Sequence, residues 1–332
     1  MNLETLHKYY EEGWLIKQIH PTLPLTIWNY SQSTQYEGKW DEITSHCRGL
    51  VTDDEGNIVA RPFKKFFNIE ESKHTPTKDF EVFEKMDGSL GIFFYYKGEP
   101  VFTSRGSFTS DQAIKGTELL NKYNWRNGTY EGYTYVFEII YSENRIVVNY
   151  GDTEELIVIG VFNTLTGEEC NYTEMESEGF VLVNKYNFKE YDDIKDLNWE
   201  NSEGFVIKFS NGDRCKIKFE DYVRLHKIMT EISTKSVWKC LSNGDDIYEL
   251  LKDVPDEFFI VIDEYIGELK SEYSLIESKT TATFNINKNL SRKDFAESVK
   301  WNKYSSVLFK MMDGKDYSDN IWRIIKPEYK KL

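Results

Sequence analysis

A change in hydrophobic periodicity near residue 240 constrains the fold of this chain more than any other feature. Before that point, short runs rich in Val, Ile, Phe and Tyr alternate with turn residues, as in CRGLVTDDEGNIVARPF, TYVFEIIYSENRIVVNY and EGFVIKFSNGDRCKIKF. This alternation is typical of antiparallel strands, and Asn211-Gly212 between two such runs predicts a hairpin turn. We therefore expect a sheet-rich domain over residues 1–240.

Residues 241–332 follow a helical pattern instead. Apolar residues recur at spacings of three and four in IYELLKDVPDEFFIVIDEYIGELKSEY, SRKDFAESVKWNKYSSVLFKMM and NIWRIIKPEY, which predicts amphipathic helices. Ser291, followed by Asp294, predicts a helix start. The fold class is therefore α+β, with an antiparallel-sheet-rich domain followed by a small all-helical C-terminal domain. The simplest role for the helical domain is to pack on the first domain, and the alternative is that it selects the RNA substrate.

Composition and targeting signals favour a cytoplasmic protein. The longest apolar runs, such as LIVIGVF at 156–162, are far shorter than the roughly 20 residues that span a membrane, and the first residues lack the apolar stretch of a signal peptide. The four cysteines are widely separated and form no CxxC pair, which indicates reduced thiols rather than a zinc site or a disulfide framework. They are Cys47, Cys170, Cys215 and Cys240.

The formal net charge of -15 argues against a nucleic-acid partner when it is taken as an average. Binding depends on local charge, however. Between Lys208 and Lys239, eight Lys and Arg residues stand against four Asp and Glu residues. A basic site on an acidic body is therefore compatible with this composition.

The segment EKMDGSLGIFFYY contains the sharpest candidate for chemistry. Lys85 leaves one predicted strand at a turn made by Asp87 and Gly88, before a second strand begins at Leu90. A lysine nucleophile must lose its proton, and the ordinary pKa near 10.4 opposes this unless nearby cations or a dry environment favour the neutral amine. Taken alone, a lysine before an Asp-Gly turn is more often a solvated strand end.

Other basic residues could surround such a nucleophile. Lys216 and Lys218 in RCKIKF are two positions apart on a predicted strand, so both point to one face, where they suit a phosphate. Arg48, Lys64 and Lys65 lie beside strands and turns in HCRGLV and RPFKKFFNIEE, where they could grip a polyphosphate. An ordinary exposed surface is the alternative for each group.

Two acidic residues stand in apolar surroundings, Glu138 in YVFEIIY and Glu203 in SEGFVIKF. A buried carboxylate needs a partner, and Mg²⁺, a ribose hydroxyl or a cation would serve. The alternatives are a water-facing position at a strand edge or a structural ion pair with Arg145.

In their order along the chain, these segments resemble the ATP-dependent RNA ligase 1 family of T-even bacteriophages, within the covalent nucleotidyltransferase superfamily. Residues 85–88 resemble motif I, TSRGSF motif Ia, and FEII with NRIV motif III. ELIVIGV resembles motif IIIa, EGFVIK motif IV and KIKFEDYVRLH motif V. CRGL and RPFKKFFN resemble the family's amino-terminal segment, which DNA ligases lack.

The resemblance implies an adenylyltransferase domain and assigns roles to residues. Lys85 would take AMP from ATP, with Lys216, Lys218 and Glu203 completing the catalytic set. Hydrated Mg²⁺, or Mn²⁺ in its place, would lie near Glu138, Glu203 and Tyr222. The implied nucleotide-binding residues are Arg48, Lys65, Phe67, Glu84, Arg105, Glu138, Glu203, Lys216 and Lys218.

The implied function is the joining of a 5′-phosphate to a 3′-hydroxyl at single-stranded RNA ends, including those of cleaved tRNA. The enzyme would act as a monomer in the cytoplasm, or in the cytoplasm of an infected host if the chain is of phage origin. A different nucleotidyltransferase, such as a DNA ligase or a capping guanylyltransferase, is one alternative, and a non-catalytic RNA-end binder is another. Arg105 departs from the lysine that the phage enzymes carry in motif Ia. Predicted helices rather than an all-β module follow motif V, which favours the RNA ligase.

Overall fold

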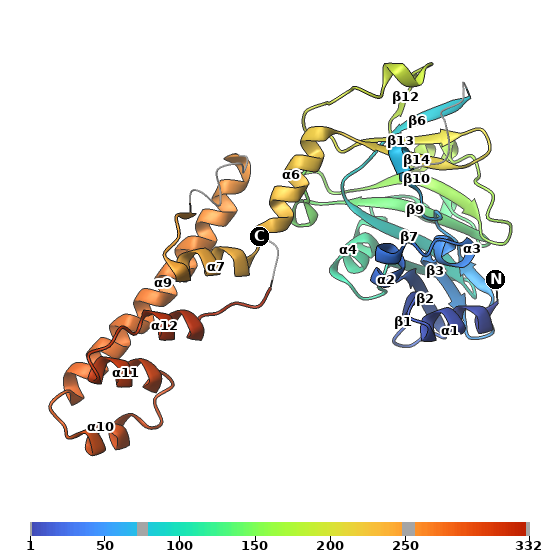
Figure 1. Cartoon of the computed structure of the whole chain (residues 1–332). Coiled ribbons are helices and arrows are strands. Elements are labelled where there is room, and N and C mark those ends of the chain that lie inside the picture. The colour runs from blue at the N-terminus through green and yellow to red at the C-terminus, as the bar shows by residue number, and fades with distance from the viewer. Residues whose placement is uncertain (1, 72–78, 248–255, 330–332) are drawn as a thin grey trace. The chain divides into compact units, whose positions relative to one another are not determined.

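The computed structural model describes residues 2–71, 79–247 and 256–329. The chain divides into two compact units, Met1–Val223 and Arg224–Leu332 (Figure 1). The boundary expected after residue 240 falls within helix α7 (Thr234–Asn243), whereas the division by contacts comes earlier. The first unit combines helices with antiparallel-rich sheets and the second is helical, which confirms the α+β class.

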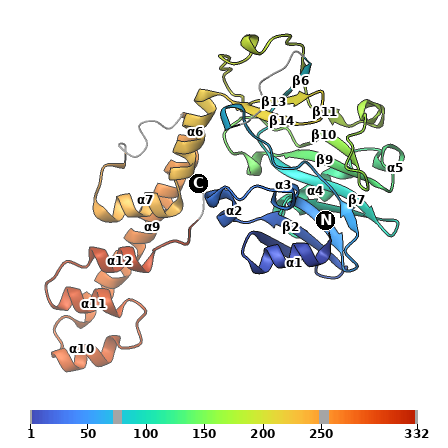
Figure 2. The same cartoon turned by 45° about the vertical axis from the view of Figure 1, so that its right-hand side comes forward.

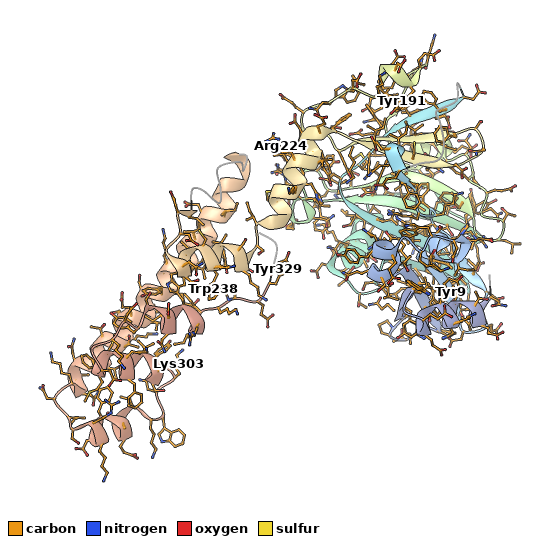
Figure 3. The ribbon with its side chains drawn as sticks, in the orientation of Figure 1. Tyr9, Tyr191, Arg224, Trp238, Lys303 and Tyr329 are labelled. Carbon is orange, nitrogen blue, oxygen red and sulfur yellow. The ribbon has the colours of Figure 1, made fainter. Side chains whose placement is uncertain are left out.

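A four-stranded sheet forms the amino-terminal part of the first unit. Its order is β1 (Leu15–Ile19), β2 (Leu25–Tyr30), β3 (Arg48–Asp53) and β4 (Ile58–Ala60), all antiparallel. Helix α1 (Leu3–Glu11) contacts β1, and its Leu6 packs in a core with Trp28. Figure 2 shows α1 below β2. Two short helices, α2 (Gln32–Glu37) and α3 (Glu42–His46), connect β2 to β3. The Tyr9 hydroxyl of α1 donates to Asp41, the N-cap of α3, over 2.9 Å (Figure 3).

A second sheet, of five strands, is buried on both faces. Its order is β11 (Val181–Leu182), β10 (Glu155–Asn163), β9 (Tyr133–Ile140), β7 (Ser89–Tyr96) and β8 (Glu99–Ser104), with only β10 and β11 parallel. Strand alternation sends Phe93 and Phe137 into one core and Ile92 and Val136 into another, which is shared with the first sheet. Glu138 is two residues beyond Val136 and therefore faces the first sheet.

The first of those two cores also contains residues of helices α4 (Asp111–Leu120) and α5 (Trp125–Gly128). Short 3₁₀ turns complete the unit at Ile69–Glu71, Ser142–Asn144, Thr173–Glu178 and Tyr191–Asp193.

The third sheet has the order β12 (Lys185–Tyr186), β6 (Phe80–Glu84), β13 (Gly204–Phe209), β14 (Arg214–Lys218) and β5 (Phe67–Asn68). The hairpin predicted at Asn211-Gly212 joins β13 to β14, with Gly212 at φ +83°. Strand β5 pairs parallel to β14, with Asn68 opposite Lys216. Residues 85–88 connect this sheet to the second one, because β6 ends at Glu84 and β7 begins at Ser89.

The second unit is built around α9 (Asp256–Asn287), which packs with α7, α11 (Ser305–Met312) and α12 (Ser318–Ile324). Helix α6 (Glu220–Glu231) leads into it and supplies Met229 to its core. The Trp238 indole donates to the carbonyl of Trp322 over 2.9 Å (Figure 3). Met229, Ile232 and residues of α7 belong to the core of the second unit. The boundary between the two units therefore precedes residue 240.

Helix predictions in this unit are confirmed with one refinement. Ser291 caps α10 (Arg292–Val299) by accepting from the Asp294 amide, as predicted. The pattern over 291–312 forms two helices, α10 and α11, rather than one. Part of the predicted helix that starts at Ile247, residues 248–255, lies outside the described residues.

All four cysteines are free, and three of them are buried. In the described parts of the chain, no helix is both long and apolar enough to cross a membrane.

Candidate active site

The turn that carries Lys85 lies between two sheets, which explains how a strand-end lysine becomes partly enclosed. The Lys85 amide donates to the carbonyl of Gly204 over 2.9 Å, which ties the turn to the start of β13. The Gly88 amide donates to Glu138 Oε1 over 3.0 Å, which ties it to β9. Only 20% of the Lys85 side chain is exposed. The alternative of a solvated strand end is therefore wrong.

A buried aspartate holds this turn in shape. Asp87 is 3% exposed, and one of its oxygens accepts from the amides of Val147 and Val148 over 2.8 Å each. Its other oxygen accepts from the Tyr222 hydroxyl over 2.7 Å. The Asp87 amide donates to the Tyr150 hydroxyl over 2.8 Å. Both carboxylate oxygens and the amide of Asp87 thus take part in hydrogen bonds, which hold the backbone next to Lys85 in place.

One glutamate bridges two of the predicted lysines. Glu203 Oε2 lies 2.8 Å from Lys85 Nζ, and Glu203 Oε1 lies 2.8 Å from Lys218 Nζ. The Glu203 side chain is 4% exposed, so the water-facing alternative is wrong for this residue. Two cations on one buried carboxylate satisfy its hydrogen-bonding capacity and hold the Lys85 amine in a fixed direction.

Lys216 completes a group of cations beside this bridge. On β14, Cys215 and Ile217 are buried while Lys216 and Lys218 face the other way, as the alternation predicted. Burial and the neighbouring Lys85, Lys218 and Lys65 lower the pKa of Lys216 to about 8. Lys216 therefore lies close enough to Lys85, Lys218 and Lys65 to interact with them electrostatically.

Glu138 faces the same group from the second sheet. Burial raises the pKa of its carboxyl to about 7, although Lys85 and Arg48 act in the opposite direction. Its hydrogen bond from Gly88 likewise favours the ionised form. Glu138 therefore changes charge near neutral pH, which is unusual for a carboxyl group and typical of a functional site.

Arg48 reaches the site from β3 and retains a free donor. Its Nη1 atom is buried and has no hydrogen-bond partner among the described residues. Burial lowers the pKa of this guanidinium, which is partly offset by Tyr30. A buried donor without an acceptor is costly. An anionic ligand such as a phosphate would satisfy it.

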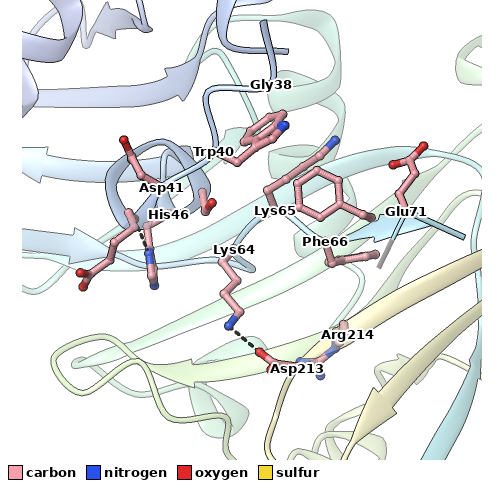
Figure 4. Close-up of a pocket in the computed structure, with 13 residues that line it drawn as sticks. Gly38, Trp40, Asp41, His46, Lys64, Lys65, Phe66, Glu71, Asp213 and Arg214 are labelled. Carbon is pink, nitrogen blue, oxygen red and sulfur yellow. Dashed lines mark hydrogen bonds and ion pairs between the residues drawn. The ribbon is translucent and has the colours of Figure 1, made fainter. Parts of the chain in front are cut away.

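Lys65 and Phe67 line a pocket of about 780 Å³ in the first unit (Figure 4). The Lys65 amine lies 5.2 Å from the centre of the Phe67 ring and 5.2 Å from that of the Trp40 ring. Lys64, which precedes Lys65 in the chain, instead forms an ion pair with Asp213, with 2.6 Å between Nζ and Oδ1. Figure 4 shows the Lys64 side chain pointing away from Lys65. Only the second lysine of the pair is thus available for a ligand.

Three other predicted residues, Glu84, Arg105 and Tyr222, contact groups outside the lysine bridge. The Glu84 carboxylate accepts from Asn184 over 2.6 Å, although it is adjacent to Lys85 in sequence. Arg105 is exposed and lies beside Tyr30, with 3.4 Å between its Nη1 and the Tyr30 hydroxyl. The Tyr222 hydroxyl binds Asp87, and the Tyr222 ring lies 4.8 Å from Lys218 Nζ.

Two aromatic residues at the site were not predicted. Tyr30 and Trp40 contact the basic residues of the amino-terminal segment. They precede every motif that the sequence analysis used, and their segment, LTIWNYSQSTQYEGKW, is indistinguishable from an ordinary strand and loop. No local signal could have identified them.

The described residues contain no group of three or more His, Cys, Asp or Glu side chains that could hold a metal ion. Glu138 and Glu203 provide two carboxylates at the site, and Glu203 is already paired with lysines. Such a set fits a hydrated Mg²⁺ or Mn²⁺ that is held mainly by water and substrate phosphates, rather than an all-protein cage.

Comparisons with known proteins show which proteins this chain resembles. A family model described as RNA ligase matches residues 46–224. A protein provisionally named as an RNA ligase, from Thermovibrio ammonificans, is 33% identical over 204 residues, covering 55% of this chain and 53% of that protein. A protein provisionally named as a bifunctional polynucleotide kinase/RNA ligase, from Autographa californica nuclear polyhedrosis virus, is 27% identical over 223 residues, covering 56% of this chain and 31% of that protein.

This chain therefore spans about half the length of the first relative and a third of the second. Among solved structures, a protein from Aquifex aeolicus that is provisionally titled an ATP-dependent DNA ligase aligns with a TM-score of 0.50 and 17% identity. The alignment covers 82% of this chain and 75% of that one. At this identity the likeness shows a shared fold and no more.

Proposed function

This chain belongs to the RNA ligase family, and from that premise we propose that it joins a 5′-phosphate RNA end to a 3′-hydroxyl RNA end with ATP, through AMP bound covalently to Lys85. The observation that carries the proposal is the buried bridge in which Glu203 holds both Lys85 and Lys218 at 2.8 Å. A lysine that is directed, partly enclosed and surrounded by phosphate-binding cations suits a nucleophile.

The first step would transfer adenylate to the protein. The neutral Lys85 amine attacks the α-phosphorus of ATP, so an N–P bond forms while the bond to the bridging oxygen breaks. Pyrophosphate leaves with the electron pair, and the amine releases a proton to water. Lys216 and Lys218 face this region from β14 and would stabilise the negative charge on the α-phosphate.

The two later steps would use the same site. An oxygen of the RNA 5′-phosphate attacks the phosphorus of Lys85-bound AMP, the N–P bond breaks, and the lysine leaves as an amine after its nitrogen takes a proton from water. The 3′-hydroxyl oxygen then attacks the RNA 5′-phosphorus, so a phosphodiester forms, AMP departs and the hydroxyl proton goes to water. When bound, Mg²⁺ or Mn²⁺ would neutralise phosphate charge near Glu138 and Glu203.

The substrates are assigned on the same basis. Single-stranded RNA ends, including those of cleaved tRNA, are the proposed acceptors, and ATP is the proposed nucleotide. Lys85, Lys216 and Lys218 give the acidic chain a local group of cations that could bind phosphates. Tyr222 is proposed to act mainly through Asp87, since its hydroxyl donates there. We propose action as a monomer in the cytoplasm.

Labelling with ATP that is radioactive at the α-phosphate tests the nucleophile. Purified protein with Mg²⁺ should become labelled, and Lys85→Ala should abolish labelling because no other amine occupies that position. Lys189→Ala is the matched control, since Lys189 is exposed in the same unit, and it should label like the parent chain. Full labelling of the Lys85→Ala protein would disprove the assignment.

The acceptor is tested with 5′-phosphorylated single-stranded RNA, followed by a gel for circles and concatemers. Parallel reactions with GTP and with 5′-phosphorylated DNA separate the proposed ligase from a guanylyltransferase and a DNA ligase. Labelling by GTP alone, sealing of DNA alone, or RNA binding with no labelling would each support a competing function and contradict this one.

A further inference from the structure

Three aromatic rings surround the amine of Lys65. Its Nζ lies 5.4 Å from the centre of the Tyr30 ring and 5.2 Å from the centres of the Trp40 and Phe67 rings. The rings also pack edge to face, with Trp40 at 5.0 Å from Tyr30 and 5.3 Å from Phe67. They form an aromatic cage, defined here as Tyr30, Trp40 and Phe67, that fixes the direction of a side chain with several rotatable bonds.

Tyr30 contacts a second cation and influences a third. Its hydroxyl lies 3.4 Å from Arg105 Nη1, and its ring centre lies 5.8 Å from the Arg105 guanidinium carbon. A hydrogen bond with Tyr30 also supports the pKa of Arg48 against the lowering that burial causes. Tyr30 therefore contacts Lys65 and Arg105, and it acts electrostatically on Arg48.

The backbone around Tyr30 reinforces this arrangement. Its amide donates to the carbonyl of Cys47, directly before Arg48, over 2.7 Å. The neighbouring Asn29 donates its side-chain amide to the carbonyl of Arg105 over 3.0 Å. The end of β2 thus sets the positions of both Arg48 and the turn that bears Arg105.

An aromatic cage stabilises a cation without neutralising it. Within residues 2–71, 79–247 and 256–329, no carboxylate forms an ion pair with Lys65 or with Arg105. A carboxylate partner would compete with a phosphate for the same donors, whereas a ring face does not. Among the described residues, Lys65 and Arg105 are thus two neighbouring cations without a carboxylate ion pair, and a bound anion would offset their mutual repulsion.

We infer that Tyr30 is a positioning residue that holds Lys65, Arg48 and Arg105 in place for the β- and γ-phosphates of ATP, with Trp40 as the second wall around Lys65. The inference rests on the proposed function and extends it to the amino-terminal sheet. Tyr30 and Trp40 both precede residue 46, where the match to the RNA ligase family begins. Tyr30 ends strand β2 of the first sheet, and Trp40 lies between helices α2 and α3.

The test compares binding of ATP with binding of AMP, which lacks the two outer phosphates. Both are titrated by calorimetry into protein that carries Lys85→Ala, so that no covalent step intervenes. Adding Tyr30→Leu should weaken ATP binding about tenfold, a factor equal to about 1.4 kcal/mol, and leave AMP binding unchanged. Tyr30→Phe keeps the ring and should restore most of the affinity for ATP.

Tyr36→Leu is the matched control, because Tyr36 is 87% exposed in α2 of the same segment. It should leave both affinities unchanged. Equal loss of ATP and AMP binding in the Tyr30→Leu protein would mean that the ring serves only the fold, and unchanged ATP binding would mean that the cage is unimportant. Loss in Tyr30→Phe as large as in Tyr30→Leu would contradict positioning by the ring.

A second readout uses the protein with Lys85 intact. Tyr30→Leu should raise the KM for ATP in self-labelling about tenfold with a smaller change in kcat. It should not slow the sealing of RNA that is already adenylylated at its 5′ end, because the pyrophosphate leaving group of ATP takes no part in that step. Equal slowing of both reactions would overturn the inference. If the parent chain fails to label at all, the proposed function fails, while the comparison of ATP with AMP still decides the role of Tyr30.

Discussion

Lys216 shows how neighbouring residues change the chemistry of a side chain that looks ordinary in sequence. It is buried beside Lys85, Lys218 and Lys65, and its pKa falls to about 8. Below that pH the ammonium persists, and above it the side chain becomes neutral. A residue that stabilises phosphate charge would therefore lose its effect at moderately alkaline pH.

This leads to a prediction for the pH dependence of self-labelling. Lys216→Arg keeps a positive charge at all accessible pH values, because the guanidinium pKa is above 12. We expect the ratio of kcat/KM for ATP, parent over Lys216→Arg, to fall as the pH rises through about 8. The ratio removes the contribution of Lys85 deprotonation, which both proteins share. A ratio that stays constant from pH 7 to 9.5 would contradict a charged role for Lys216.

At the residue scale, the sequence identified most of the cluster but could not establish its contacts. Alternation predicted that Lys216 and Lys218 share a face, and they do. It could not predict that Glu203 joins Lys218 to Lys85, because the two lysines are separated by more than a hundred positions. It also could not predict that the Glu84 carboxylate accepts from Asn184, a hundred positions away.

At the scale of elements, the hairpin of β13 and β14 supports the site through one glycine. Gly204 has a φ of +139°, and a Cβ at this position would collide with the carbonyl oxygen of Ile217 on β14. The close approach brings Glu203 next to Lys218 and allows the Gly204 carbonyl to accept from the Lys85 amide. This glycine is therefore required by both conformation and space.

Gly204→Ala should separate the two strands and disturb the lysine bridge. We expect a loss of about 1–3 kcal/mol from backbone strain, increased by the collision, together with a severe loss of self-labelling. Urea unfolding and the labelling assay would measure the two effects. Gly212→Ala is the matched control, because it has φ +83° in the same hairpin but open space around it, so it should cost about 1 kcal/mol and retain labelling. Equal effects of the two substitutions would refute this role of Gly204.

The amino-terminal segment reaches the site through a pairing that no local pattern could predict. Strand β5 has two residues and pairs parallel to β14, with Asn68 opposite Lys216. The Lys65 amide also donates to the carbonyl of Ser45 over 2.7 Å. These two contacts bring Lys65 near the lysines of motif V.

At the scale of the whole molecule, the two units have separate cores. The first includes Phe93 and Val136, and the second includes Val307 and Leu308. Separate cores favour separate unfolding transitions, because neither core requires the side chains of the other. Only the first unit contains the proposed nucleotide site.

Calorimetric unfolding should therefore show two transitions. In the Lys85→Ala background, ATP at about 100 times its Kd should stabilise only the first unit, by about 2.7 kcal/mol. Leu308→Ala, at a fully buried position, should lower only the transition of the second unit, by about 2–5 kcal/mol. Leu275→Ala, at a half-exposed position on α9, is the control and should change little. A single transition that both perturbations shift would contradict independent units.

The sequence by itself determined the features that depend on short-range order. Side-chain alternation, turn residues and caps act over a few positions, so the strands, the hairpin at Asn211-Gly212 and the cap at Ser291 could be predicted. The order of the motifs likewise identified the family and the residues of its cluster.

Only the tertiary structure decided which distant segments meet. The aromatic cage around Lys65, the bridge through Glu203 and the burial of Asp87 all join residues that are far apart in sequence. Such contacts are selected by long-range burial and charge pairing, which leave no periodic trace in the chain. For the same reason, the division between the units falls at Val223 and Arg224 rather than at the change in periodicity.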